Sequence, residues 1–216
     1  GLFGIGGGFL MAPILVFLGI PPTVAVASQA SHVVASSTSG VIRYAGQGAV
    51  DFKMGVVMAV GGAAGALMGV ELFRYLRLLG QADLVIAFSY LVFLGAIGAL
   101  MLNESLSEIL RRRRGAPAPR KERRRPLWLY GLPLKMKFPK SGLYISALPP
   151  FGLGVFAGVL SAIMGVGGGF ILVPAMLYVL RMRAGAVVGT SLFQIIITTA
   201  ITTVLQAGRN QTVDVV

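Results

Sequence analysis

The chain has 216 residues, of which 56% are hydrophobic and 12% are charged, with a formal net charge of +12 and a mean hydropathy of +0.82. About a quarter of the residues of a soluble domain are charged, so this composition excludes an ordinary soluble enzyme or soluble binding domain. The sequence has no cysteine, which excludes disulfides and thiolate metal sites.

The first feature along the chain is GIGGGFLMAP (Gly4 to Pro13), in which three consecutive glycines precede apolar residues and a proline. Each glycine costs about 1 kcal/mol relative to alanine inside a helix, and proline removes a backbone hydrogen bond. In lipid, a broken helix is tolerated only where protein or a water-filled cavity surrounds it. We therefore predict a helix break, followed by a short helix over Phe9–Leu18 that cannot span a bilayer alone.

Four longer runs are almost free of charge, and each is close to the roughly 20 residues that a helix needs to cross a bilayer. They are Val24–Ile42, Met54–Phe73, Leu84–Leu102 and Ala186–Ala207. One such run is compatible with a buried helix of a soluble protein, but four indicate an all-α polytopic membrane protein. In the second run, Gly61, Gly65 and Gly69 recur every four residues, which predicts a face for close helix packing.

Residues 103–142 carry most of the positive charge. The segment holds twelve Lys or Arg and three Glu, and so contributes +9 to the net charge. Its centre, RRRRGAPAPRKERRRP, is polar, interrupted by proline and free of aromatic residues. This is typical of a flexible linker rather than of a folded domain that reads bases. We expect no nucleic-acid binding, and we expect residues 111–125 to contact anionic lipid headgroups.

The positive-inside rule orients the chain. It places the polybasic linker in the cytoplasm, beside a cell (inner) membrane that the chain crosses several times. The two spans before the linker then form a hairpin, with Arg43 and Lys53 on the cytoplasmic side and Arg74 and Arg77 at the outer interface.

The opening motif returns as GVGGGFILVP (Gly165 to Pro174), 161 positions later, with six identities in twelve aligned residues. The segments that follow, VASQASHVVASSTSG and VGTSLFQIIITTAIT, are also similar after a one-residue slip. These likenesses predict a duplication, with a first repeat over 1–102, the linker over 103–142 and a second repeat over 143–216. Apolar segments flank the two copies unequally, so we expect the first repeat to be incomplete at its start and the second at its end.

Short helices interrupted by glycine at corresponding positions of two repeats indicate the binding site of a secondary transporter. The repeat helices carry no Asp, Glu, Lys or Arg at mid-depth. A helix that begins after the glycines presents free N–H groups and the positive end of its dipole. The next helix of the second copy adds a polar stripe with a spacing of four, namely Thr190, Gln194, Thr198, Thr202 and Gln206. The pattern predicts a small oxyanion held by backbone donors and neutral side chains, although single Ser or Thr residues often only bond the preceding turn.

The segments GLFGIGGGFLMAPIL, GIPPTVAVAS and GVGGGFILVPAML…VVGTSLFQ resemble the two signature repeats of the TauE/SafE family of sulfite exporter-like membrane transporters. The resemblance implies a two-repeat transporter that exports small anions such as sulfite, sulfoacetate or related sulfur-containing or organic oxyanions, without a cofactor. Carried over by position, the site involves Gly6, Gly7, Gly8, Ser28 and Gln29 in the first copy and Gly167, Gly168, Gly169, Thr190 and Ser191 in the second. We add Gln194 from the polar stripe of the second copy. We also add His32 from a similar stripe of the first copy, in which Ser28, His32, Ser36 and Ser39 recur every three or four residues.

Other functions fit the motifs less well. The glycine runs lack the third glycine of a dinucleotide fingerprint, and no Walker lysine follows them. No acid is placed to orient His32 as the base of a nucleophile, so we predict no enzyme. A passive anion channel remains the alternative, because a pore and a carrier can share one lining. The duplication favours alternating access, in which one repeat rocks against the other. We expect coupling to an ion, which the residues do not identify.

Three questions stay open at this stage. His32 either bonds a backbone carbonyl or lines the cavity, where it would gain positive charge as the inside acidifies. Asp51 and Asp214 are the acids that could carry protons, but we interpret them as solvated residues at the membrane edge. Repeat parity depends on whether each glycine-rich pair of helices is re-entrant, which makes the copies antiparallel, or spans, which makes them parallel. We favour inverted repeats.

Overall fold

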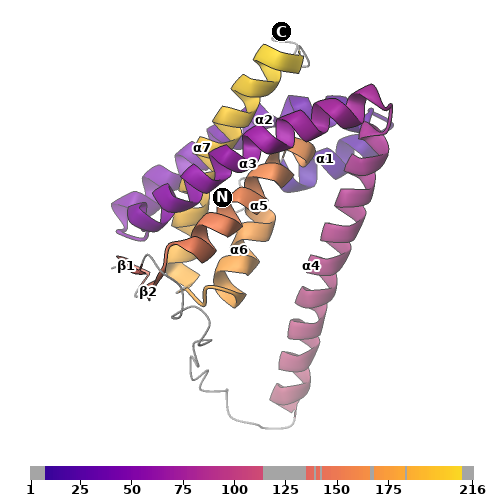
Figure 1. Ribbon diagram of the computed structural model, residues 1–216. Coiled ribbons are helices and arrows are strands. Elements are labelled where there is room, and N and C mark those ends of the chain that lie inside the picture. Colours follow the sequence, from indigo (N-terminus) through magenta and orange to yellow (C-terminus); the bar gives the residue numbers. More distant parts are fainter. Residues whose placement is uncertain are drawn as a thin grey trace.

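The computed structural model describes residues 8–113, 135–138, 140–141, 143–165, 168–182 and 184–210 (Figure 1). Within these ranges the chain is mainly helical, with one small hairpin. The elements are α1 (Gly8–Phe17), α2 (Pro22–Gly46), α3 (Phe52–Leu78), α4 (Ala82–Arg113), β1 (Lys135–Phe138), β2 (Leu143–Ser146), α5 (Leu148–Met164), α6 (Gly169–Tyr178) and α7 (Ala184–Asn210).

Three of the described helices are long and apolar enough to cross a membrane, over Phe52–Leu78, Ala82–Ser107 and Gly185–Leu205. They contain the predicted runs Met54–Phe73 and Leu84–Leu102, and they overlap the run Ala186–Ala207 as far as Leu205. The fourth run lies in α2, which is long enough but is not one of the three because Ser, Thr, Gln and His lower its hydropathy. The prediction of an all-α membrane protein is therefore confirmed in its coarse form, as a mostly helical chain with three apolar spans.

Helices α3 and α5 approach each other through glycine. The glycines at this interface are Gly61, Gly62, Gly65 and Gly69 on α3 and Gly154 and Gly158 on α5. A methyl group placed on Gly69 would lie 2.7 Å from Cβ of Ala162, so the absence of side chains allows the backbones to meet. The predicted packing face is confirmed. Gly61 faces Phe151 and Gly69 faces Val159, so the two helices run in the same direction.

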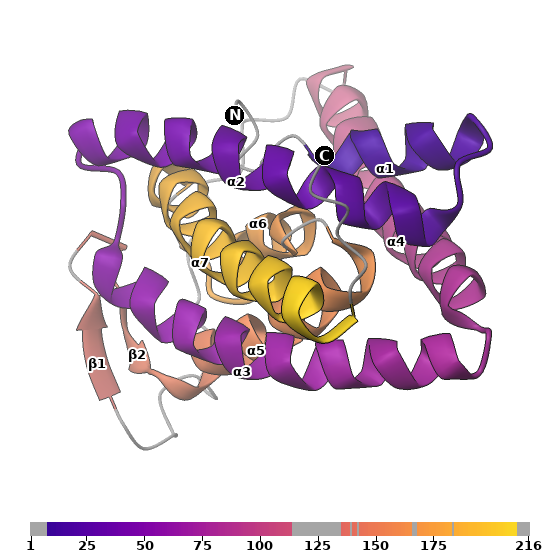
Figure 2. The same cartoon turned by 90° about the horizontal axis from the view of Figure 1, so that it is seen from above.

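Helix α7 lies between α2 and α3 and crosses both (Figure 2). The contacts with α2 follow an antiparallel order. Gly40 lies against Leu192, whereas Gly189 lies against the carbonyl of Ala49 in the turn after α2. The first turns of α7 therefore pack against the end of α2, and α2 and α7 run in opposite directions.

Helix α4 leaves the end of α3 at a steep angle and has fewer neighbours than α3 or α7 (Figure 1). It continues through Arg113, beyond the predicted end of the span at Leu102, because Glu104 to Arg113 contains good helix formers and no Gly or Pro. The hairpin of β1 and β2 was not predicted. It pairs Lys135 with Ser146 and Phe138 with Leu143 in antiparallel register.

The described core has two parts. The larger combines buried residues of α2, α3, α5, α6 and α7 with the hairpin residues Phe138 and Ile145. The smaller joins the end of α3, the first half of α4 and the end of α5, around Ile86, Tyr90 and Met164. The turn between α5 and α6 thus has a packed cluster on each side.

Candidate functional site

The turn between α5 and α6 contains two left-handed glycines. Helix α5 ends at Met164, followed by Gly165 at φ 69°, and Gly168 at φ 68° precedes the first residue of α6, Gly169. Only glycine adopts this backbone region freely. At Gly168 a methyl group would also lie 2.7 Å from the carbonyl oxygen of Ala157, so a side chain is excluded twice.

The start of α6 is buried. Gly168 and Gly169 are both buried, and no side chain caps the helix. In the first hydrogen bonds of the helix, the N–H groups of Ile171 and Leu172 donate to the carbonyl of Gly168, each at a distance of 3.1 Å. The N–H groups of Gly169 and Phe170 have no acceptor within the helix, as at every helix start. A buried helix N-terminus without a cap can be satisfied by a ligand.

The other predicted glycines are less informative. Gly6, Gly7 and Gly167 lie outside the described residues. Gly8 is the first residue of α1, which occupies the position of the short helix expected in the first copy. The description of the glycine site therefore rests on the second copy.

Gln29 reaches the turn between α5 and α6 from α2. Its side chain is fully buried. Nε2 donates to the hydroxyl of Tyr90 at a distance of 3.2 Å and to the carbonyl of Met164 at 3.3 Å. The Tyr90 hydroxyl donates to the same carbonyl over 2.9 Å. Two side chains from α2 and α4 therefore bind the last carbonyl of α5, next to the predicted break.

Sequence reasoning did not identify Tyr90. The only signal was a tyrosine in an otherwise apolar run, since a buried phenol needs a hydrogen-bond partner. Its partners lie 61 and 74 positions away, and no local pattern could name them.

The polar stripe of α7 faces the interior. Four of its five residues are buried, namely Thr190, Gln194, Thr198 and Thr202. The side chain of the fifth, Gln206, lies outside the described part of the chain. Nε2 of Gln194 donates to Oγ1 of Thr198 over 2.8 Å, and both side chains lie against Gly62 of α3. Gln194 and Thr198 therefore pack against α3 at Gly62 and are not exposed to lipid.

The remaining predicted residues differ in their surroundings. Ser191 is buried and donates to the Val188 carbonyl over 3.0 Å, the back-bond that a membrane serine often makes. Thr190 accepts a hydrogen bond from the backbone N–H of Asp51 over 3.0 Å. His32 is exposed on α2, and the side chain of Ser28 is outside the description.

The interpretation of Asp51 as a solvated residue is wrong. Asp51 is 2% exposed, and its Oδ1 accepts a hydrogen bond from the Met54 N–H as the N-cap of α3. Its Oδ2 accepts two hydrogen bonds from Ser141, one from the backbone N–H at 2.9 Å and one from the hydroxyl at 2.6 Å. Asp51 is buried because one carboxylate caps a helix and holds the hairpin turn at once.

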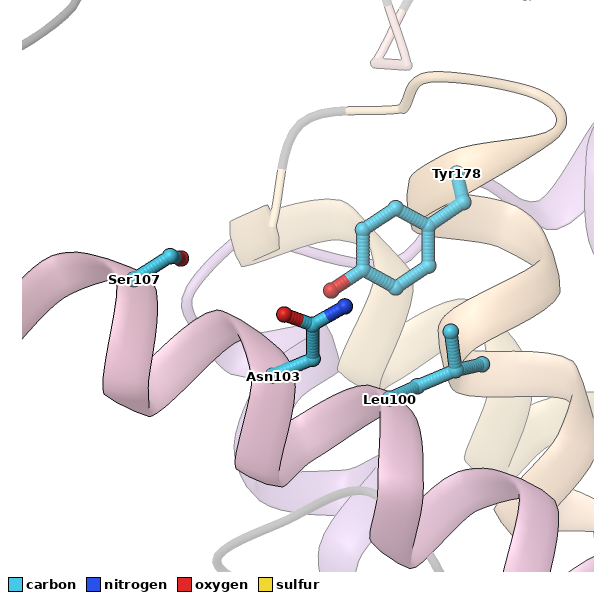
Figure 3. A pocket seen from close by; sticks show the side chains of 4 residues that line it. All are labelled: Leu100, Asn103, Ser107 and Tyr178. Atoms are coloured by element: carbon cyan, nitrogen blue, oxygen red, sulfur yellow. The ribbon is translucent and has the colours of Figure 1, made fainter.

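A shallow pocket of about 310 Å³ lies elsewhere, between α4 and the end of α6. Leu100, Asn103, Ser107 and Tyr178 line it, and Asn103 points toward the phenol of Tyr178 (Figure 3). No predicted site residue is among these four. Within the described part of the chain, no cluster of His, Asp or Glu could hold a metal ion.

Comparison with known proteins identifies the family. The model of the sulfite exporter TauE/SafE family matches residues 1–216. The chain belongs to this family. The interpretation of the paired glycine motifs as those of TauE/SafE is thus confirmed.

Curated relatives of this TauE/SafE chain carry transporter names. A probable membrane transporter protein of Xylella fastidiosa strain 9a5c is 29% identical over 99% of this chain and 70% of its own length. A second, from strain Temecula1, is 28% identical over 90% of this chain and 64% of its own length. YjnA of Bacillus subtilis strain 168, also named a probable membrane transporter protein, is 26% identical over 89% of this chain and 67% of its own length. No solved structure matches the chain.

The chain therefore covers about two thirds of the length of these relatives. Its family and the three apolar spans among the described residues make it a multi-pass membrane transporter protein. The family is one of transporters and suggests no catalytic activity.

Proposed function

We propose that this TauE/SafE protein moves small oxyanions, such as sulfite, sulfoacetate or related sulfur-containing or organic anions, across the cell (inner) membrane. The observation that carries the proposal is the start of α6, which is buried and has no side-chain cap. Free N–H groups and the helix dipole favour negative charge at that point. No lysine or arginine lies between Ala186 and Ala207 of the neighbouring helix α7. The proposal therefore rests on backbone N–H groups as the hydrogen-bond donors to the anion.

The proposed site combines these backbone donors with neutral side chains. In the second copy it comprises Gly167, Gly168, Gly169, Thr190, Ser191 and Gln194. In the first copy it comprises Gly6, Gly7, Gly8, Ser28, Gln29 and His32. The burial of Gln29 beside the turn that ends in Gly168 supports a single site that both copies contribute to. The proposal requires no cofactor, no metal and no catalytic residue.

Inverted repeats and alternating access are part of the proposal. Two facts support inversion. Helices α2 and α7, which are equivalent in the repeats, run in opposite directions, and the first turns of α7 pack against the turn after α2. In transporters built from inverted repeats, substrate binds where the repeats meet, and one unit rocks against the other. Ion coupling fits a carrier of this kind, whereas an uncoupled pore is the alternative function.

The orientation follows from charge. Lys53, in the first turn of α3, lies at the same end of the bundle as the hairpin, which carries Lys137 and Lys140. Arg74 and Arg77 lie at the opposite end of α3. With residues 103–142 included, the excess of positive charge favours a cytoplasmic position for this end. Residues 111–125 then lie beside anionic headgroups.

The experiment that tests the function is flux of isotope-labelled sulfite in proteoliposomes that contain the full-length protein, with and without an imposed pH gradient. Uptake that saturates and responds to the gradient supports a coupled carrier. Gly168→Leu should abolish this uptake, because a side chain at φ 68° would meet Ala157. Flux that never saturates would favour the channel, and absence of flux for sulfite and for sulfonates would refute anion transport.

A further inference from the structure

Hydrogen-bond directions around Met164 are determined by chemistry. A backbone carbonyl only accepts hydrogen bonds. The amide nitrogen of Gln29, not its oxygen, must therefore face the carbonyl of Met164, from which it lies 3.3 Å. The hydroxyl of Tyr90 donates its proton to the same carbonyl, and so it accepts from Gln29. The orientation of the Gln29 amide follows without ambiguity between oxygen and nitrogen.

The opposite atom of this amide has no partner. Oε1 of Gln29 is buried and finds no hydrogen-bond donor among the described residues. The whole side chain is 0% exposed. An unsatisfied buried acceptor is unfavourable, so buried polar atoms normally find a protein group, a water or a ligand.

The unsatisfied oxygen lies at the turn between α5 and α6. It is separated from Nε2 only by the width of one amide group, and Nε2 contacts the last carbonyl of α5. Four residues after that carbonyl, Gly168 precedes the buried and uncapped start of α6. The buried acceptor of Gln29 therefore lies beside the turn that leads into the buried start of α6, where no side chain caps the helix.

We propose that Gln29 selects the transported anion, because Oε1 accepts a hydrogen bond from it. The ligand must then be an anion that still carries a proton donor, such as a singly protonated oxyanion or a hydroxy-substituted sulfonate. An anion without a donor would place its negative oxygens against Oε1 of Gln29, which would then still lack a hydrogen bond. The repulsion between these oxygens would select against such an anion. This inference rests on the proposed function and narrows its substrate class.

The test compares two anions that differ in one hydroxyl group. Uptake of 2-hydroxyethanesulfonate and of ethanesulfonate, which have the same charge and carbon skeleton, is measured with the full chain in proteoliposomes. A hydrogen bond to a buried acceptor should make Vmax/KM about 5- to 100-fold higher for the hydroxylated anion. In Gln29→Met, which has a side chain of similar length without an acceptor, the ratio should fall to about one.

Tyr90→Phe is the matched control. Both variants remove one donor from the carbonyl of Met164, but only Gln29→Met removes the free acceptor. Tyr90→Phe should therefore lower the rate for both anions and keep their ratio. A purely structural role of Gln29 would instead lower both rates in both variants without any change of ratio.

The outcomes separate the inference from the proposed function. Equal Vmax/KM values in the wild type, with saturable uptake of both anions, would overturn the inference alone and assign a buried water to Oε1. Preference that persists in Gln29→Met would also overturn it. If Gln29→Met does not fold, the wild-type ratio still decides. Absence of uptake of both sulfonates and of sulfite would refute the proposed function, and the inference with it.

Discussion

Gly168 combines two constraints in one residue, a left-handed backbone and a contact with Ala157 that leaves no room for Cβ. We expect Gly168→Ala to destabilise the protein by roughly 1–3 kcal/mol, because strain at a positive φ adds to the steric clash. The measurement is the thermal unfolding midpoint in detergent, together with sulfite uptake. Because α6 starts at this residue, uptake should fall more than the amount of folded protein.

Gly152→Ala is the control for that prediction. Gly152 lies in α5 and is exposed, and no atom lies within 4 Å of the position that an alanine methyl group would take there. Alanine should therefore leave stability unchanged or raise it by up to about 1 kcal/mol. Equal midpoints for the two variants would contradict the role given to the backbone of Gly168.

At the residue scale, the sequence predicted those parts of the site that have a local signal. Three consecutive glycines mark the turn between α5 and α6, and the spacing of four marks the buried face of α7. The contact of Gln29 with Tyr90 and Met164 could not be predicted, because it joins residues 61 and 135 positions apart. For Asp51, its place near a span end indicated solvent, whereas Ser141, 90 positions away, buries it.

At the element scale, hydropathy predicted the spans and glycine spacing predicted the interface of α3 with α5. The hairpin of β1 and β2 was hidden because four-residue strands within a basic segment have neither the length nor the periodicity of a clear signal. Phe138 of the predicted linker and Ile145 of the predicted second repeat are each 1% exposed in the main core, which shows that the hairpin is packed against the helices. The order of the helices along the chain can be predicted from composition, but the packing of the hairpin against the helices cannot.

Asp51 should control that docking. We expect Asp51→Ala to lower stability by about 0.5–2 kcal/mol through loss of the N-cap, and to speed amide hydrogen exchange in the hairpin, since both bonds to Ser141 are lost. Ser141→Ala removes only the hydroxyl bond and should have a smaller effect. Hydrogen exchange followed by mass spectrometry measures both variants.

Glu71→Ala serves as the comparison for Asp51→Ala. Glu71 also belongs to α3, but it is exposed and lies 4.0 Å from Arg74, a surface pair of little energetic value. Its removal should leave hairpin exchange unchanged. Exchange that is equally unchanged in Asp51→Ala would show that burial of Phe138 and Ile145 holds the hairpin without the carboxylate.

At the scale of the whole molecule, the directions of the helices decide how transport can work. Parallel copies would place their equivalent turns on one side of the membrane, whereas inverted copies would place them on opposite sides. In the proposed duplication, the turn after α1 corresponds to the turn after α6. The latter leads into the first turns of α7, beside the end of α2, while the former leads into the start of α2. The two ends of α2 therefore separate these turns.

Single cysteines can test this arrangement without background, because the chain has none. In the proposed duplication, Leu18 corresponds to Val179, which lies 161 positions later, and both residues are exposed. In intact cells, a membrane-impermeant maleimide should label Leu18→Cys, whereas Val179→Cys should react only after the membrane is opened. Gln81→Cys, just after α3, and Gln47→Cys, at the end of α2, calibrate the outside and the inside. Labelling of Leu18→Cys and Val179→Cys from the same side would establish parallel repeats and remove the basis for alternating access between inverted halves.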